Sequence, residues 1–197
     1  GQRLQDVRAV LYATAAFAIF CVLSGVVYLV NDVADRETDR QHPAKRLRPI
    51  ASGDLPVGTA LAAAAVLGAA ALAAAFWLRP AFGVIGALYL GLLAGYSGPL
   101  KHVVIIDVLT IAAGFVLRAA AGGLAIDVPI SSWLLLCTGM LAVFLGLAKR
   151  RGEAVAMGGG AQPSRPVLER YSLTLLDELI AVVTPATLVS YAAWAVV

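Results

Sequence analysis

The sequence predicts an all-α protein, a polytopic transmembrane helical bundle, and three observations support this fold class. Of the 197 residues, 60% are hydrophobic and 14% are charged, whereas an average soluble domain has roughly 25% charged residues. The apolar residues form six continuous runs, close to the length of about 20 residues that a membrane-spanning helix needs. Most basic residues lie in the two long connections between these runs. Soluble, disordered and disulfide-stapled classes are therefore excluded.

Each apolar run has the composition of one transmembrane helix, because spanning β-strands would instead show short alternating segments. Tight turns separate the middle runs at Arg79-Pro80, at Ser97-Gly98-Pro99 and at Asp127-Val128-Pro129. We expect a single transmembrane domain over residues 1–197, truncated at both ends, because the chain begins at a glycine and stops inside an apolar run. The predicted helices cover residues 9–30, 57–78, 81–98, 102–125, 131–148 and 173–197.

The two long loops, residues 31–56 and 149–172, hold most of the 15 Lys and Arg residues. By the positive-inside rule both loops are cytoplasmic. The net charge of +3 thus indicates orientation in a membrane, and we expect no nucleic-acid partner. The charge distribution predicts a multi-pass membrane protein whose two long loops face the cytoplasm.

Three carboxylates open the first loop. Asp32, Asp35 and Asp39 follow an i, i+3, i+7 spacing, which on a continuing helix places them within about 60° of one another. Carboxylates that share one face repel each other unless a cation neutralises them. Oxygen ligands of this kind suit Mg²⁺, which also bridges to substrate phosphates. The alternative is a solvated acidic helix end that pairs with the nearby arginines.

A basic segment follows directly, from His42 to Gly53. Its Lys45 and Arg48 are candidates for binding phosphate oxygens that a metal leaves uncovered. An acidic metal site beside phosphate-binding cations is the arrangement that stabilises a diphosphate leaving group. The alternative is that these cations only anchor the loop on the cytoplasmic side.

The segment from Asn31 to Gly53 resembles the first aspartate-rich motif of the UbiA-type membrane prenyltransferase superfamily. The resemblance continues through Tyr96-Ser97 and Lys101 and through the stretch from Asp107 to Arg118 and Gly123, and it covers about residues 20–194. It implies a bundle of about nine helices around a polar cavity, about six of them in this chain. It also implies substrate-binding roles for Asn31, Tyr96, Lys101 and Arg118.

The superfamily's second aspartate-rich motif is expected at the second loop, where the chain reads Lys149-Arg150-Arg151-Gly152-Glu153. This run, the stretch from Arg165 to Tyr171 and the region of Arg118 resemble the phosphoribosyltransferase branch. That branch moves 5-phosphoribose from phosphoribosyl diphosphate to a polyprenyl (decaprenyl) phosphate and supplies a precursor of bacterial cell-wall arabinan.

The resemblance implies a role for each candidate residue. Asp32, Asp35 and Asp39 would hold Mg²⁺, and Lys45 and Arg48 would act in catalysis with Asp32 and Asp35. The resemblance adds substrate binding by three residues of the second loop, Lys149, Arg150 and Glu153.

Several alternatives remain open at this stage. One alternative is that the three cations from Lys149 only anchor the helix end. Glu153 either binds a metal or pairs with Arg150. One rival function is a prenyltransferase acting on an aromatic, quinone-pathway acceptor, which the missing second acidic motif disfavours. Another is a non-enzymatic lipid-binding or transport bundle. A homo-oligomer is compatible with each of these functions.

Overall fold

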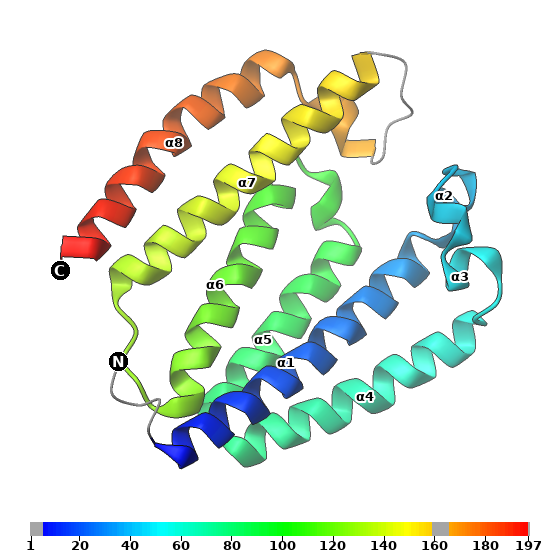
Figure 1. Cartoon of the computed structure of the whole chain (residues 1–197). Helices are drawn as coiled ribbons and strands as arrows, with labels where there is room; N and C mark the ends of the chain where they lie inside the picture. The colour runs from blue at the N-terminus through cyan, green and yellow to red at the C-terminus, as the bar shows by residue number, and fades with distance from the viewer. Residues whose placement is uncertain (1–5, 159–165, 197) are drawn as a thin grey trace. The chain divides into compact units, whose positions relative to one another are not determined.

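The computed structural model describes residues 6–158 and 166–196, and in them the regular structure is all helical. Six helices are long and apolar enough to cross a membrane, which confirms the predicted fold class (Figure 1). They are α1 (Val7–Ala34), α4 (Val57–Leu78), α5 (Pro80–Ser97), α6 (Ile106–Ile126), α7 (Ser132–Gly158) and α8 (Leu173–Val196). The connections hold the short helices α2 (Arg36–Gln41) and α3 (Pro49–Ser52) and the 3₁₀ turns η2 (Lys45–Leu47), η3 (Leu100–His102) and η4 (Pro166–Arg170).

Helix boundaries match the sequence prediction for α4 and differ at two informative places. α6 begins at Ile106 instead of residue 102, because Ile105 has φ of +70° and cannot continue a right-handed helix. α7 runs ten residues beyond the predicted end at 148. Its extension holds strong helix formers and an ion pair between Arg150 and Glu153, spaced i, i+3. Part of the predicted second loop is therefore helix.

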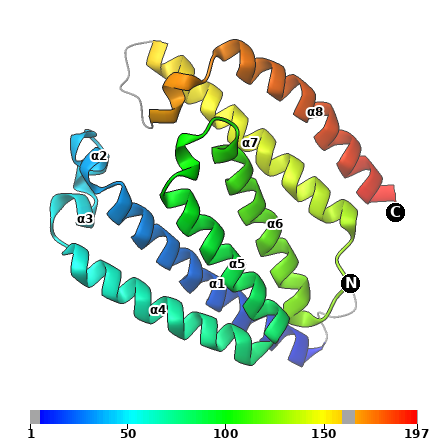
Figure 2. The same cartoon turned by 180° about the vertical axis from the view of Figure 1, so that it is seen from behind.

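The chain packs as two compact units, and the first comprises the residues up to Ser97 together with Leu117–Pro129. In this unit α1 and α4 lie side by side and antiparallel (Figures 1 and 2). The buried residues of α4 are all small, which lets two helices approach closely. A methyl group added at Gly68 would touch Val26 of α1 at 3.5 Å. The buried small residues of α4 are Ala60, Ala64, Gly68, Ala71 and Ala75.

Aromatic rings fill the space between α1 and α5 in this unit. Phe20 lies edge-on to Phe82 and to Tyr89, with ring centroids 5.5 and 5.3 Å apart. Phe82, Tyr89 and the neighbouring Leu23 are fully buried. Edge-to-face packing of this kind adds to the stabilisation from burial and fixes α5 against the middle of α1.

The second unit comprises Gly98–Val116 and the residues from Ile130 onward. Here α7 and α8 run antiparallel and adjacent (Figures 1 and 2). Gly146 of α7 allows the start of α6 to approach, since an added methyl group would lie 2.7 Å from Val108. The buried apolar core of this unit consists of Val108, Leu147, Val167, Tyr171 and Leu176.

We predict that Gly83→Ala destabilises the first unit. The new methyl carbon would lie 2.5 Å from the ring of Phe76, and overpacking of this kind costs about 1–3 kcal/mol. The melting temperature of the purified protein in detergent should fall. Gly91→Ala on the same helix is the control, because nothing lies within 4 Å of its added methyl group. Equal melting temperatures for both variants would contradict the packing described.

Candidate active site

The acidic segment is bent, not a continuous helix as the sequence spacing assumed. α1 carries Asn31 and Asp32 in its last turn and ends at Ala34. Asp35 leaves the helical conformation, with φ of −92° and ψ of 1°, and α2 begins directly after it. Asp39 therefore lies on α2, where it is buried. The bend turns the two outer carboxylates toward a third segment of the chain.

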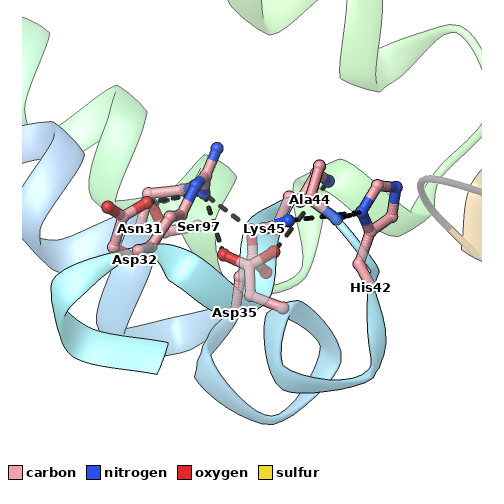
Figure 3. A network of polar contacts seen from close by, with 9 residues as sticks. Asn31, Asp32, Asp35, His42, Ala44, Lys45 and Ser97 are labelled. Atoms are coloured by element: carbon pink, nitrogen blue, oxygen red, sulfur yellow. Dashed lines mark hydrogen bonds and ion pairs between the residues drawn. The ribbon is translucent and has the colours of Figure 1, made fainter. Parts of the chain in front are cut away.

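That third segment supplies Arg48. Its Nη1 donates to Asp32 Oδ1 and to Asp39 Oδ2, each at 2.8 Å. Lys45 Nζ lies 3.9 Å from Asp39 Oδ1. The Asp39 side chain is 3% exposed, whereas Asp32 is 27% and Arg48 is 40% exposed. Two carboxylates thus converge on one cation at the end of α1, and that cation is still in contact with solvent. Figure 3 shows this network.

Asp35 faces a different partner. Asn31 Nδ2 donates to Asp35 Oδ2 at 3.1 Å, and Ser97 at the end of α5 lies with its Oγ 3.5 Å from Asn31 Oδ1. These residues lie together in Figure 3. Asn31 therefore connects Asp35 and the acidic segment to α5.

The basic segment is held in place by its own polar side chains. His42 Nδ1 accepts the backbone N–H groups of Ala44 and Lys45 at 3.2 and 3.4 Å, which caps the turn η2. Arg40 Nε donates to the carbonyl oxygen of Ala51 at 2.9 Å. Gly53 has φ of +98° at the end of α3, a conformation that glycine adopts without strain. The positions of Lys45 and Arg48 are thereby defined.

The carboxylate oxygens of Asp32 and Asp39 are the kind of ligand that Mg²⁺ prefers. Among the described residues, no three His, Cys, Asp or Glu side chains are gathered as a metal-binding group. Asp32 and Asp39 nevertheless direct oxygens at one cation, and Mg²⁺ binds proteins through one or two carboxylates together with substrate phosphates. Of the three predicted ligands, the structure thus brings two together and turns Asp35 toward Asn31.

A cavity of about 560 Å³ lies in the first unit, and Arg118 lines it. The guanidinium group lies 5.1 Å from the centre of the Tyr89 ring and donates to the Tyr89 hydroxyl. Ser24 Oγ is 3.2 Å from the same hydroxyl. Sequence reasoning identified Arg118 but not Ser24 or Tyr89, whose hydroxyls stand alone within apolar runs. The apolar lining includes Phe17, Phe20, Cys21 and Phe82.

In the second unit Arg150, a predicted substrate-binding residue, is buried and ion-paired. The side chain is 2% exposed; its Nε donates to Asp107 Oδ2 at 2.8 Å and its Nη1 to Glu153 Oε2 at 3.1 Å. Asp107 is fully buried. Because α7 continues past residue 148, Arg150 lies on the face toward α6 instead of in a solvated loop. Glu153 is its ion-pair partner, one of the two roles that the sequence left open.

The cations on either side of Arg150 are placed differently. Lys149 and Arg151 are both exposed, and Arg151 pairs with Asp177 of α8. Lys101 lies on η3 and is partly buried. Tyr96, in the first unit, packs against the core around Leu23 and Tyr89. Arg165 lies outside the described residues.

Tyr171 is a site residue to which the sequence gave no role. Its hydroxyl donates to Asp107 Oδ1 at 2.6 Å and accepts the backbone N–H of Ile105 at 2.7 Å. Burial, and then the hydrogen bond to Asp107, raise the pKa of Tyr171 well above its usual range. The phenol therefore keeps its proton at every physiological pH. In the sequence, Tyr171 was distinguished only because it ends the stretch from Arg165 that resembles the phosphoribosyltransferase branch.

Six apolar helices with a carboxylate–cation centre at the end of one of them define a multi-pass membrane protein with a polar site. The chain belongs to the UbiA prenyltransferase family, whose model matches residues 3–154. It is 35% identical to the decaprenyl-phosphate phosphoribosyltransferase of Mycolicibacterium smegmatis, over 92% of this chain and 57% of that protein. The enzyme of the same name from Corynebacterium glutamicum is 36% identical over 95% of this chain and 57% of the relative.

The chain thus spans less than two thirds of the length of these curated relatives. Among solved structures, a UbiA homolog from Archaeoglobus fulgidus bound to DMAPP and Mg²⁺ superimposes with a TM-score of 0.77 at 18% identity. The match covers 94% of this chain and 66% of that one. It confirms the helical bundle of the UbiA type.

We predict that Arg150→Ala strongly destabilises the protein, whereas Arg151→Ala does not. Removing one partner of a buried ion pair leaves Asp107 uncompensated, which costs about 3–5 kcal/mol. Arg151 and Asp177 are both about half exposed, so water replaces their contact. Melting temperatures in detergent should separate these neighbouring substitutions clearly. A stable Arg150→Ala protein would contradict the structural role assigned to this pair.

Proposed function

We propose that this protein is an Mg²⁺-dependent membrane phosphoribosyltransferase that moves 5-phosphoribose from phosphoribosyl diphosphate to a polyprenyl (decaprenyl) phosphate. The observation that supports this most is the convergence of Asp32 and Asp39 on Arg48. It provides anionic metal ligands and a phosphate-binding cation at one place. Relatives at 35–36% identity bear the name of this activity. The product would serve cell-wall arabinan synthesis in bacteria.

Each residue of the first unit has a task in this proposal. Asp32 and Asp39 hold Mg²⁺, with Asp35 and Asn31 beside them, and Arg48 exchanges its carboxylate partners for oxygens of the donor diphosphate. Lys45 binds the same diphosphate. When bound, Mg²⁺ neutralises part of the negative charge that grows on the leaving diphosphate. Interactions that strengthen as this charge grows accelerate the reaction.

The transfer exchanges one bond at C1 of the ribose for another. The bond from C1 to the diphosphate oxygen breaks, and the electron pair leaves with the diphosphate. An oxygen of the lipid phosphate forms the new bond to C1 from the opposite face. Because this phosphate is already an anion, the step needs no general base.

The remaining candidate residues have binding roles in the proposal. Lys101 and Lys149 of the second unit bind phosphate oxygens of the donor or the acceptor. The apolar cavity beside Arg118 accepts the polyprenyl chain. Ser24, which also lines it, precedes Asp32 by eight residues, or about 12 Å along the helix. That distance suits a lipid chain whose phosphate lies at the acidic end of α1.

The decisive experiment compares donors. Membranes that contain the protein receive decaprenyl phosphate and either labelled phosphoribosyl diphosphate or a labelled prenyl diphosphate. We expect label in the lipid product only with the first donor and only with Mg²⁺ present. Prenyl transfer to an aromatic acceptor would instead support the quinone-pathway alternative. Binding without any Mg²⁺-dependent turnover would favour the non-enzymatic bundle.

Asp32→Asn tests the proposed metal ligand. Loss of a charged metal contact weakens transition-state stabilisation by several kcal/mol, so turnover should fall about 100-fold or more. Initial rates at saturating Mg²⁺ measure this. Glu37→Gln is the matched control in the same segment. The Glu37 side chain is 72% exposed, and its ion-pair partners among the described residues are Arg36 and Arg40. Near-normal turnover of Asp32→Asn would remove Asp32 from the metal site.

The proposed cytoplasmic orientation predicts a labelling pattern. Single cysteines replace Thr38 of α2 or Ser131 before α7, both exposed, in a protein without Cys21 and Cys137. In intact cells an impermeant thiol reagent should label the cysteine at position 131 and spare that at 38. Inverted vesicles should give the opposite result. Labelling of position 38 from outside would reverse the topology.

A further inference from the structure

The turn that precedes α6 has a strained backbone at Ile105. This β-branched residue has φ of +70°, a left-handed conformation that such side chains rarely adopt. Its carbonyl oxygen accepts the first hydrogen bonds of α6, from Val108 at 3.1 Å and from Leu109 at 2.9 Å. Strain of this kind persists only where surrounding contacts hold the backbone in place. The contacts at Ile105 should therefore be identifiable.

Tyr171 makes the contact that holds Ile105, and its hydrogen bonds have only one possible direction. A carboxylate accepts and does not donate, so the phenol proton points at Asp107 Oδ1, at 2.6 Å. The phenol oxygen is then left to accept the N–H of Ile105, at 2.7 Å. Arg150 Nε donates to the other carboxylate oxygen of Asp107, Oδ2, at 2.8 Å and holds this side chain in place. A buried ion pair thus orients the phenol, and the phenol orients the backbone.

The turn transmits this constraint to Lys101. Lys101 lies on η3, four residues before Ile105. Within the turn, His102 N–H donates to the carbonyl oxygen of Pro99 at 3.1 Å, and Val103 N–H to that of Leu100 at 3.2 Å. Arg170, next to Tyr171 in the chain, has its Nη1 3.5 Å from the carbonyl oxygen of His102. The turn that carries Lys101 is thus held at His102 by Arg170 and at Ile105 by Tyr171.

We propose that Tyr171 is a positioning residue that sets the place of Lys101 through the backbone of Ile105. This inference rests on the proposed function, in which Lys101 binds phosphate oxygens of a substrate. Tyr171 touches no substrate itself. Its effect is on the binding of that phosphate group and not on the bond changes at C1.

Tyr171→Phe tests the proposal, since it keeps the buried ring and removes only the hydroxyl. Partial loss of a charge-assisted hydrogen bond from Lys101 should raise KM for one of the two substrates roughly 10-fold. We expect kcat to change less than about twofold, because interactions confined to the transition state are left in place. Tyr191→Phe is the matched control, on an exposed side chain of α8.

A rescue variant separates positioning from general stability. In Tyr171→Phe, the added substitution Ile105→Gly removes the conformational penalty at φ of +70°, so KM should return toward the wild-type value. Hydrogen exchange of the segment 99–108 should rise in Tyr171→Phe and stay unchanged in Tyr191→Phe. KM equal to wild type in Tyr171→Phe overturns the inference, as does a fall in kcat with unchanged KM. A wild-type protein that transfers no phosphoribose overturns the proposed function and this inference with it.

Discussion

A carboxylate that leaves water must be neutralised, because an unpaired buried charge costs more than a fold can offset. Both polar centres of this chain follow from that constraint. Asp39 is buried on α2 and meets Arg48, and Asp107 is buried on α6 and meets Arg150. Arg48 follows Asp39 by nine residues, whereas Arg150 follows Asp107 by 43. Each ion pair helps to determine where the segment that carries its arginine lies. The loop after α1 and the extension of α7 are placed in this way.

The two ion pairs differ in solvent exposure, and this difference separates their uses. Arg48 is 40% exposed, whereas Arg150 is 2% exposed. A partly solvated guanidinium exchanges carboxylate for phosphate at modest cost, since both are anions that accept the same bidentate hydrogen bonds. A guanidinium enclosed with Asp107, Glu153 and the core of its unit has no such freedom. The first pair is suited to ligand binding and the second to holding structure.

Helix positions were predictable from the sequence, because a run of about 20 apolar residues has few alternatives to a spanning helix. α4 matches its predicted bounds, and the residues of the acidic and basic segments were identified correctly as neighbours in space. The break at Asp35 was not predictable, because the i, i+3, i+7 spacing is equally compatible with one continuous helix. The strain at Ile105 was not predictable either, since it depends on a contact with Tyr171, 66 residues further along the chain. The burial of Arg150 was not predictable for a similar reason. A cation that follows an apolar run looks the same in the sequence whether its side chain contacts water or a buried aspartate.

The burial of Arg150 also changes how the missing second acidic motif is understood. Its positive charge is neutralised by Asp107, and Glu153 is held by the same guanidinium. These two carboxylates are thus engaged by an arginine. The exposed cations on either side of it are Lys149 and Arg151, and Arg151 pairs with Asp177. In the proposed function such a surface attracts a phosphate, since a second divalent metal site would need several carboxylate oxygens. One acidic centre at the end of α1 and exposed cations within α7 fit the proposed reaction, in which only one substrate carries a diphosphate.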